Sequence, residues 1–337
     1  MRTLIILVLT GFNSFSQEGK LFENKVTHFE LSIENDTIDF IVVDTVLTEE
    51  KPVFLFCQGS QPIPLFIDDE KKDVFFFGGG VSNFDVKKIK ESYHLVVISM
   101  PETPLIAKTS KLNRSYSYIT DSTDQHSYKG TYLKADYLEN YVKRANTVLS
   151  FLLKQSWTKK IKLVVAGHSQ GARVATKLAS DNINITHLGL FSFNPFGRIE
   201  QMIRQERKYA KEGEKTWGEA EEKIAYWEQL WKDANNADSV EVNPELIAWK
   251  SFSSSQIDDL LTIKIPIYLC YGTEDLAAAN CDIIPLIFTS NGKNNLTLKR
   301  KQGVGHNFFG VKENGQTDFK KSNWIEVMNE FVEWTNK

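Results

Sequence analysis

Cysteine is scarce in this 337-residue chain, which contains only Cys57, Cys270 and Cys281. Such a small, odd set excludes a disulfide-stapled miniprotein and leaves at least one thiol unpaired in a monomer. Cys57 and Cys270 lie in apolar runs, where cysteine usually acts as a small buried hydrophobic residue. The chain also lacks C-x-x-C and H-E-x-x-H spacings, and its six histidines are scattered. The sequence therefore predicts no metal site and no cofactor.

An excess of charge of one sign is also absent. Forty Lys and Arg residues stand against 43 Asp and Glu residues, for a formal net charge of -3. This balance argues against a nucleic-acid partner, which would favour a basic surface. Hydrophobic residues make up 42% of the chain and aromatic residues 12%, enough for a large core. The composition predicts a globular protein with one large α/β domain or two smaller ones.

Long hydrophobic runs are missing, and the apolar run at the N-terminus is short. Arg2 precedes the apolar residues 4–9, and Ser14-Phe15-Ser16 follows them as a small-x-small pattern. This arrangement is typical of a cleaved signal peptide over residues 1–16, with 17–337 as the mature protein. A buried first strand is the alternative, but the polar residues after the run favour export. The sequence predicts a secreted or periplasmic protein without a transmembrane segment, since no run reaches roughly 18 apolar residues.

The remaining pattern is that of a mixed α/β protein. Residues 27–33 and 37–43 alternate in polarity around Glu34-Asn35-Asp36, which predicts an antiparallel hairpin. Further strands are predicted at 53–57, 94–100, 161–166, 188–193, 265–271 and 296–301. Helical stripes separate several of them, which favours a mostly parallel central sheet flanked by helices. One stripe predicts a single helix through Leu133, Tyr137, Tyr141, Ala145, Val148, Leu149 and Leu152, and others predict helices at 170–179 and around Trp324 to Phe331.

Residues 198–256 differ from the rest of the chain, being charged, poor in strand signals and rich in tryptophan. They predict an inserted helical cap. Trp227 and Trp231 are four residues apart and so share one helical face. Two interpretations stay open for them: walls of a substrate pocket, or contacts that dock the cap on the core.

The most informative motif is Gly167-His168-Ser169-Gln170-Gly171, between the apolar run 161–166 and a helical pattern. In a strand-turn-helix context, G-x-S-x-G holds a serine in a strained turn that exposes its hydroxyl. The flanking glycines leave room for nearby backbone, and the N-terminus of the following helix favours negative charge. Ser169 is therefore the candidate nucleophile.

A serine nucleophile needs a histidine base that is oriented by an acid. Asp275 follows the strand predicted at 265–271, and His306 lies in the glycine-containing segment after the strand predicted at 296–301. Glu274 is an alternative acid beside Asp275. Another position for the acid, at the end of the preceding strand, reads Asn194-Pro195-Phe196 and has no carboxylate.

In these residues and their order, Ser169, Asp275 and His306, the chain resembles the serine hydrolases of the α/β-hydrolase superfamily. The resemblance extends from about residue 53 to the C-terminus, with 198–256 as the variable cap. It implies an oxyanion hole made by the backbone N–H groups of Gln170 and Ser60. Where the family usually has His-Gly, this chain has Gln58-Gly59-Ser60-Gln61, so the Gln61 amide stays open as an alternative to that of Ser60.

These residues predict an enzyme that hydrolyses an ester, or a thioester or amide, through a covalent acyl-enzyme on Ser169. The expected partner is a small-molecule, acyl or peptidyl substrate. Acyl transfer and peptide cleavage use the same residues, and a noncatalytic ligand-binding protein is the alternative from another class.

Overall fold

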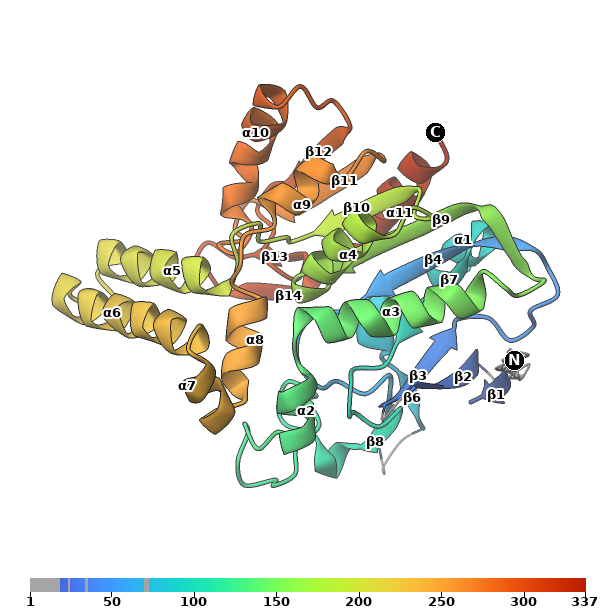
Figure 1. Cartoon of the computed structure of the whole chain (residues 1–337), viewed down its shortest axis with the longest axis horizontal. Coiled ribbons are helices and arrows are strands. Elements are labelled where there is room, and N and C mark those ends of the chain that lie inside the picture. The colour runs from blue at the N-terminus through green and yellow to red at the C-terminus, as the bar shows by residue number, and fades with distance from the viewer. Residues whose placement is uncertain (1–18, 24, 34–35, 70–72) are drawn as a thin grey trace, which may run out of the picture.

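The computed structural model describes residues 19–23, 25–33, 36–69 and 73–337, so the predicted signal peptide lies outside the described residues. At its centre is a nine-stranded sheet in the order β1-β2-β3-β7-β4-β9-β10-β11-β12 (Figure 1). These strands are β1(Lys20–Phe22), β2(Val26–Ile33), β3(Asp36–Val42), β4(Lys51–Cys57), β7(His94–Ile98), β9(Thr158–His168), β10(His187–Phe191), β11(Ile267–Gly272) and β12(Leu296–Lys301). Five short strands form two small sheets: β5(Phe66–Asp68), β6(Phe75–Phe76), β8(Ile106–Lys108), β13(Phe309–Val311) and β14(Thr317–Ser322).

The antiparallel edge of the sheet confirms the predicted hairpin. Strands β2 and β3 pair in the register Thr27 to Val42 and Ile33 to Asp36, and β3 continues antiparallel onto β7. The alternating polarity that predicts this hairpin places Phe29, Ile38 and Phe40 in the core.

From β7 to β12 every neighbouring pair is parallel, which confirms the predicted mostly parallel sheet. In the sheet, β7 lies on one side of β4, and the later strands β9, β10, β11 and β12 follow one another on the opposite side of β4. The direction of winding therefore reverses between β4 and β9. In parallel sheets such a reversal opens a crevice at the carboxyl ends of the strands, where ligands bind.

Helices cover both faces of the sheet (Figure 1). Val53 and Leu55 of β4 pack in one buried cluster with α3 and α4, whereas Phe54 and Phe56 pack in the other with α1 and α11. Strands buried on both faces read as continuous apolar runs, as the sequence of β4 does. The helices are α1(Val86–Ser92), α2(Gly130–Ala135), α3(Leu138–Leu152), α4(Gln170–Asp181), α9(Ile257–Thr262), α10(Ile284–Ser290) and α11(Trp324–Thr335), with 3-10 turns η1(Gly78–Asn83), η2(Thr109–Lys111) and η3(Ala279–Ile283).

The prediction of one helix from Leu133 through Leu152 is wrong, because the chain breaks between α2 and α3. Tyr137 adopts an extended conformation, with φ of -146° and ψ of 151°. The side chain of the buried Asp136 accepts hydrogen bonds from Tyr141 (2.8 Å) and from the Gln170 amide (3.2 Å). These buried bonds stabilise the break, and the apolar periodicity of the sequence does not reveal them.

Between β10 and α9 the chain forms four further helices: α5(Arg198–Glu212), α6(Trp217–Ala234), α7(Ala237–Val242) and α8(Glu245–Ser251). Figure 1 shows α5 and α6 as a pair that projects away from the sheet. A capping box at Thr216 and Glu219 starts α6, and Gly213 in the left-handed region ends α5.

Within the described part of the chain, no helix has the length and apolar character needed to cross a bilayer. Over the same residues, no group of three or more His, Cys, Asp or Glu side chains is arranged to hold a metal ion. All three cysteines are free thiols. Burial raises the pKa of Cys57 and of Cys270 to about 12, so both thiols are protonated at neutral pH.

Candidate active site

The turn between β9 and α4 presents Ser169. Its backbone has φ of 56° and ψ of -120°, a conformation that L-residues rarely adopt. The Ser169 N–H donates to the carbonyl oxygen of Phe191 at the end of β10 (2.9 Å), which holds the turn against the neighbouring strand. Since β9 lies next to β4 at the point where the sheet winding reverses, Ser169 lies at the crevice.

Gly171 permits a close approach between α4 and the end of β4. A Cβ atom at this position would lie 2.0 Å from the carbonyl oxygen of Cys57 and 2.4 Å from that of Gln58. Both neighbours are backbone atoms, so a side chain cannot rotate away to relieve the clash. The glycine thus sets the distance between the turn that contains Ser169 and the segment that contains Ser60.

Gly171→Ala is expected to lower the free energy of unfolding by about 2 kcal/mol or more, because the added methyl group displaces backbone. Gly59→Ala is the matched control, since its Cβ would have its nearest neighbours at an ordinary 3.8 Å. Urea denaturation of the two variants measures the difference. Equal midpoints for both variants would contradict the close approach described at Gly171.

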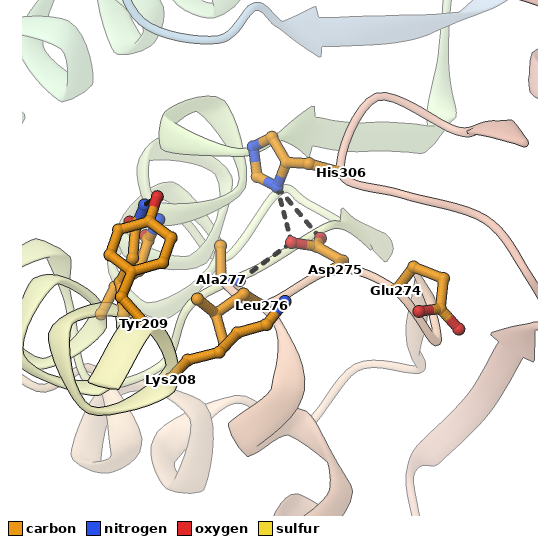
Figure 2. Close-up of a pocket in the computed structure, with 9 residues that line it drawn as sticks. Lys208, Tyr209, Glu274, Asp275, Leu276, Ala277 and His306 are labelled. Atoms are coloured by element: carbon orange, nitrogen blue, oxygen red, sulfur yellow. Dashed lines mark hydrogen bonds and ion pairs between the residues drawn. The ribbon is translucent and has the colours of Figure 1, made fainter. Parts of the chain in front are cut away.

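The structure brings Ser169, His306 and Asp275 together from three separate loops. The Nε2 atom of His306 lies 2.8 Å from Oγ of Ser169. Its Nδ1 atom lies 2.9 Å and 3.0 Å from the two carboxylate oxygens of Asp275. Figure 2 shows the imidazole directly above this carboxylate. Because a carboxylate only accepts, Nδ1 carries the proton and Nε2 is left as the acceptor for the serine hydroxyl.

Asp275 is held as an anion within the protein. Asp275 is only 2% exposed, and one of its carboxylate oxygens also accepts a hydrogen bond from the Ala277 N–H (3.0 Å). Burial raises the pKa of Asp275, but the hydrogen bond and charge of His306 lower it, and with the smaller effects of Ser192 and His168 they outweigh burial. The net effect is a pKa below the usual value, so the carboxylate is ionised at neutral pH. Glu274, the alternative acid, is exposed and points away from His306 (Figure 2).

The loops that contain Asp275 and His306 are bonded to each other. The Glu274 N–H donates to the carbonyl oxygen of Val304 (3.0 Å), and the Gly303 N–H donates to the Thr273 hydroxyl (3.0 Å). At Gly272 a Cβ atom would lie 1.9 Å from the same Val304 oxygen. This contact requires glycine and keeps the acid loop beside the histidine loop.

Two further side chains hold His306 through its backbone. Its carbonyl oxygen accepts from Nε2 of His168 (2.9 Å) and from the Ser192 hydroxyl (2.7 Å). The His168 ring lies between the rings of His306 and Trp324, with centroids 5.1 Å from each. Burial, followed by the charge of His306, lowers the pKa of His168 to about 3. His168 is therefore a neutral donor that positions the His306 loop.

This low pKa makes the stability dependent on pH. An unfolded histidine has a pKa of about 6.5, so below that pH the unfolded chain binds a proton that folded His168, with a pKa of about 3, does not. The stability that neutral His168 provides is complete above about pH 6.5 and is lost progressively as the pH falls toward 3. His168→Gln retains a donor and removes this titration. We expect the melting temperature of His168→Gln to fall less between pH 7 and pH 4 than that of the wild type. If the melting temperatures of both proteins fell equally with pH, the low pKa of His168 would be contradicted.

Ser60 and Gln170 line the cavity of about 190 Å³ that also contains Ser169 and His306. Gln170 is the first residue of α4, so its backbone N–H belongs to the helix end that carries partial positive charge. Gln61, the alternative to Ser60, does not line this cavity, and its side chain accepts a hydrogen bond from the Ser117 hydroxyl (2.7 Å). Of the two candidate residues, Ser60 and not Gln61 therefore lines the cavity of Ser169.

Comparison with known proteins bears on the fold. No model of a protein family matches the chain, and no curated protein matches it. Among solved structures, an acylaminoacyl peptidase in complex with Z-Gly-Gly-Phe-chloromethyl ketone matches with TM-score 0.54 and 12% identity over 93% of this chain and 41% of that one. The uncomplexed acylaminoacyl peptidase of Pyrococcus horikoshii matches with TM-score 0.53 and 12% identity over 91% and 41%. VinJ matches with TM-score 0.51 and 12% identity over 91% and 98%.

The chain has the α/β-hydrolase fold. It spans about two fifths of the length of the two peptidases, 41% in each case. In an α/β-hydrolase fold, the nucleophile follows a central parallel strand and the acid and histidine follow later strands. In this chain Ser169 follows β9, Asp275 follows β11 and His306 follows β12, so they are the candidates for those places.

The structure does not bring the two tryptophans singled out in the sequence to the cavity of Ser169. Trp227 packs on Trp249 of α8 with ring centroids 5.5 Å apart, so it joins two helices of the insertion. Trp231 lines a different cavity of about 640 Å³, together with Ile199 and Ile203 of α5. The spacing that places both tryptophans on one helical face does not show which way that face points.

Two cationic residues of the site are not found by the sequence reasoning. Arg173 of α4 and Arg198 at the start of α5 both line the cavity that contains Ser169. Arg173 has a sequence signal, because it lies four residues after the candidate nucleophile and therefore on the same side of the helix. Arg198 has no such signal in the sequence, since its position in the cavity depends on how α5 packs against the sheet.

Proposed function

We propose that the protein is a serine hydrolase that cleaves an ester through a covalent acyl-enzyme on Ser169. The observation that carries the proposal is the continuous hydrogen-bonded series from the Ser169 hydroxyl through His306 to Asp275, with distances of 2.8 Å and 2.9 Å. The strained conformation of Ser169 supports it, because unfavourable backbone angles persist where the surrounding structure maintains them for function.

In the first half of the reaction, Oγ of Ser169 attacks the ester carbonyl carbon while its proton passes to Nε2 of His306. Asp275 stabilises the resulting imidazolium through Nδ1 and does not itself take the proton. The negative charge on the carbonyl oxygen is received by the backbone N–H groups of Gln170 and Ser60. The tetrahedral intermediate collapses as the bond to the leaving oxygen breaks, and His306 returns the proton to that oxygen.

In the second half, water attacks the acyl carbon and gives its proton to Nε2 of His306. The new intermediate collapses by breaking the bond to Oγ of Ser169, which recovers its proton from His306. The products are an alcohol and a carboxylic acid, and the enzyme is regenerated. In this scheme the helices α5–α8 act as a cap, since α5 provides residues to the cavity of Ser169.

A fluorophosphonate probe tests the proposal, because it phosphonylates only an activated serine. We expect wild-type protein to be labelled and Ser169→Ala to remain unlabelled under the same conditions. Denatured wild-type protein is the control for nonspecific reaction. Equal labelling of wild type and Ser169→Ala would overturn the proposal.

Export is a separate part of the proposal, and it rests on Arg2, the apolar residues 4–9 and Ser14-Phe15-Ser16. Expression of the full chain in a Gram-negative host, followed by N-terminal sequencing, tests it. Periplasmic protein beginning at Gln17 is expected. Cytoplasmic protein that retains residues 1–16 would contradict export.

A further inference from the structure

The cavity beside Ser169 is lined by two arginines and by no residue with a carboxylate. Arg173 and Arg198 line it with polar residues such as Asn194 and Gln201. Elsewhere, Arg144 pairs with Asp36, Arg204 with Glu200 and Arg300 with Asp282. Over the described residues, neither Arg173 nor Arg198 forms such an ion pair. The lining of this cavity therefore carries two cationic side chains and no anionic one next to the candidate nucleophile.

Arg173 is held rigidly and is only 3% exposed. Its guanidinium donates to the carbonyl oxygens of Asn194 (2.7 Å) and Ser254, and its Nε atom has no hydrogen-bond partner in the described residues. Burial, followed by the charge of Arg198, lowers the pKa of Arg173 to about 9, so the group is still protonated at neutral pH. The charge of Asp259 raises this pKa, but no carboxylate of the described residues forms an ion pair with Arg173. A buried cation without a close ion pair is unfavourable, and a bound anion would relieve that cost.

Arg198 is also oriented by its neighbours. Its guanidinium donates to the side-chain oxygen of Gln170 and stacks over the ring of Phe252 at 4.6 Å. The Gln170 amide is in turn bonded to the buried Asp136. Because Arg198 is the first residue of α5, the positive end of the helix dipole adds to its charge. Arg198 is less buried than Arg173, so it is the more accessible of the two.

Two cavities meet at His306. The cavity that contains Ser169 also contains Ser60 and Gln170, so the acyl group belongs there. A second cavity of about 250 Å³ shares Gln201, Ala277 and His306 with the first and is also lined by Lys208, Tyr209 and the segment from Glu274 to Leu276 (Figure 2). Nδ1 of His306 faces Asp275, whereas the Nε2 atom that returns the proton faces Ser169, so the reacting ester bond belongs in the cavity of Ser169.

We infer that the acyl part of the substrate carries a carboxylate, which Arg198 binds directly and Arg173 stabilises from behind. This inference rests on the proposed function. The planar guanidinium fork of Arg198 suits a carboxylate, with which it makes paired charge-assisted hydrogen bonds. The ester is thus a half-ester of a dicarboxylic acid, and hydrolysis releases the diacid.

The experiment compares two esters with the same acyl chain, p-nitrophenyl hydrogen adipate, which ends in a carboxylate, and p-nitrophenyl adipamate, which ends in a neutral amide. The corresponding succinate and glutarate pairs test shorter acyl chains. The uncatalysed rate of each ester is subtracted. We expect kcat/KM to favour the anionic ester by at least about tenfold at one length, the size of a charge-assisted hydrogen bond. Arg198→Gln is expected to remove that preference, and Arg198→Lys to retain part of it. The exposed Arg207 of α5 lines a different cavity, so Arg207→Gln is the matched control that should keep the preference.

Binding to Ser169→Ala, measured by calorimetry with monoethyl adipate and ethyl adipamate, gives a readout that does not need turnover. Tighter binding of the anionic ester, lost in Ser169→Ala combined with Arg198→Gln, supports the inference. Equal binding and equal kcat/KM for the anionic and neutral members of every pair overturn it, even if both esters are hydrolysed through Ser169. If the anionic ester binds more tightly but the wild type hydrolyses neither ester faster than Ser169→Ala does, the proposed function fails, and with it the inference about its substrate.

Discussion

Ser169→Ala is expected to lower kcat for ester hydrolysis by about five to six orders of magnitude, because the attacking oxygen is removed. KM is expected to change little, since the Ser169 hydroxyl forms its new bond in the transition state and not on binding. His306→Ala should have a similar effect, and the double variant should be no worse than either single one. Residues that act as one unit are strongly non-additive in this way.

Ser122→Ala is the matched control for this measurement, since Ser122 is an exposed serine outside the cavity of Ser169. Its kcat should equal that of the wild type. Circular dichroism and thermal melting of Ser169→Ala verify that the fold is retained. A folded Ser169→Ala protein with more than about a hundredth of the wild-type kcat would be incompatible with a nucleophilic Ser169.

Asp275→Asn is the second large change, with an expected loss of about four orders of magnitude in kcat. The carboxylate accepts the Nδ1–H of His306, whereas an amide offers both a donor and an acceptor and permits the wrong tautomer. The imidazolium that forms during attack also loses its anionic partner. Because the pKa of Asp275 is below its usual value, its ionisation should not limit kcat in the wild type above about pH 5.

Glu274→Gln is the control for Asp275→Asn, since it removes the neighbouring carboxylate, which is exposed and points away from His306 (Figure 2). Its kcat should stay within about twofold of the wild type, as is usual for surface changes. If Glu274→Gln lost more activity than Asp275→Asn, the assignment of the acid would have to be reversed.

The parallel sheet and the meeting of Ser169 with His306 could be predicted because their signals are local. Each of the strands β4, β9 and β11 contains a short apolar run, and polar residues with glycine follow each strand. His306 likewise lies in a segment with glycines after β12. Carboxyl ends of parallel strands lie at one edge of the sheet, so residues that follow different strands meet there. The distance of 137 positions between Ser169 and His306 in the sequence is thus no obstacle.

Features that depend on tertiary contacts could not be predicted in this way. The break between α2 and α3 is stabilised by Asp136, whose partners include Gln170 of another helix. The cationic character of the cavity depends on Arg198, which reaches it only because α5 starts at the edge of the sheet. Helical spacing places Trp231 on the same helical face as Trp227, but it does not predict which cavity that face lines.

Active-site titration with p-nitrophenyl dimethylcarbamate tests the central claim most directly, because the carbamoyl-enzyme hydrolyses slowly and can be isolated. Attack by Ser169 transfers the carbamoyl group to Oγ and releases p-nitrophenol, so the account predicts a burst of one p-nitrophenolate per chain. Peptide mass mapping should then place one dimethylcarbamoyl group on Ser169, and His306→Ala should give neither burst nor adduct. A carbamoyl group on a different residue, or the absence of any burst from folded wild-type protein, would contradict the account.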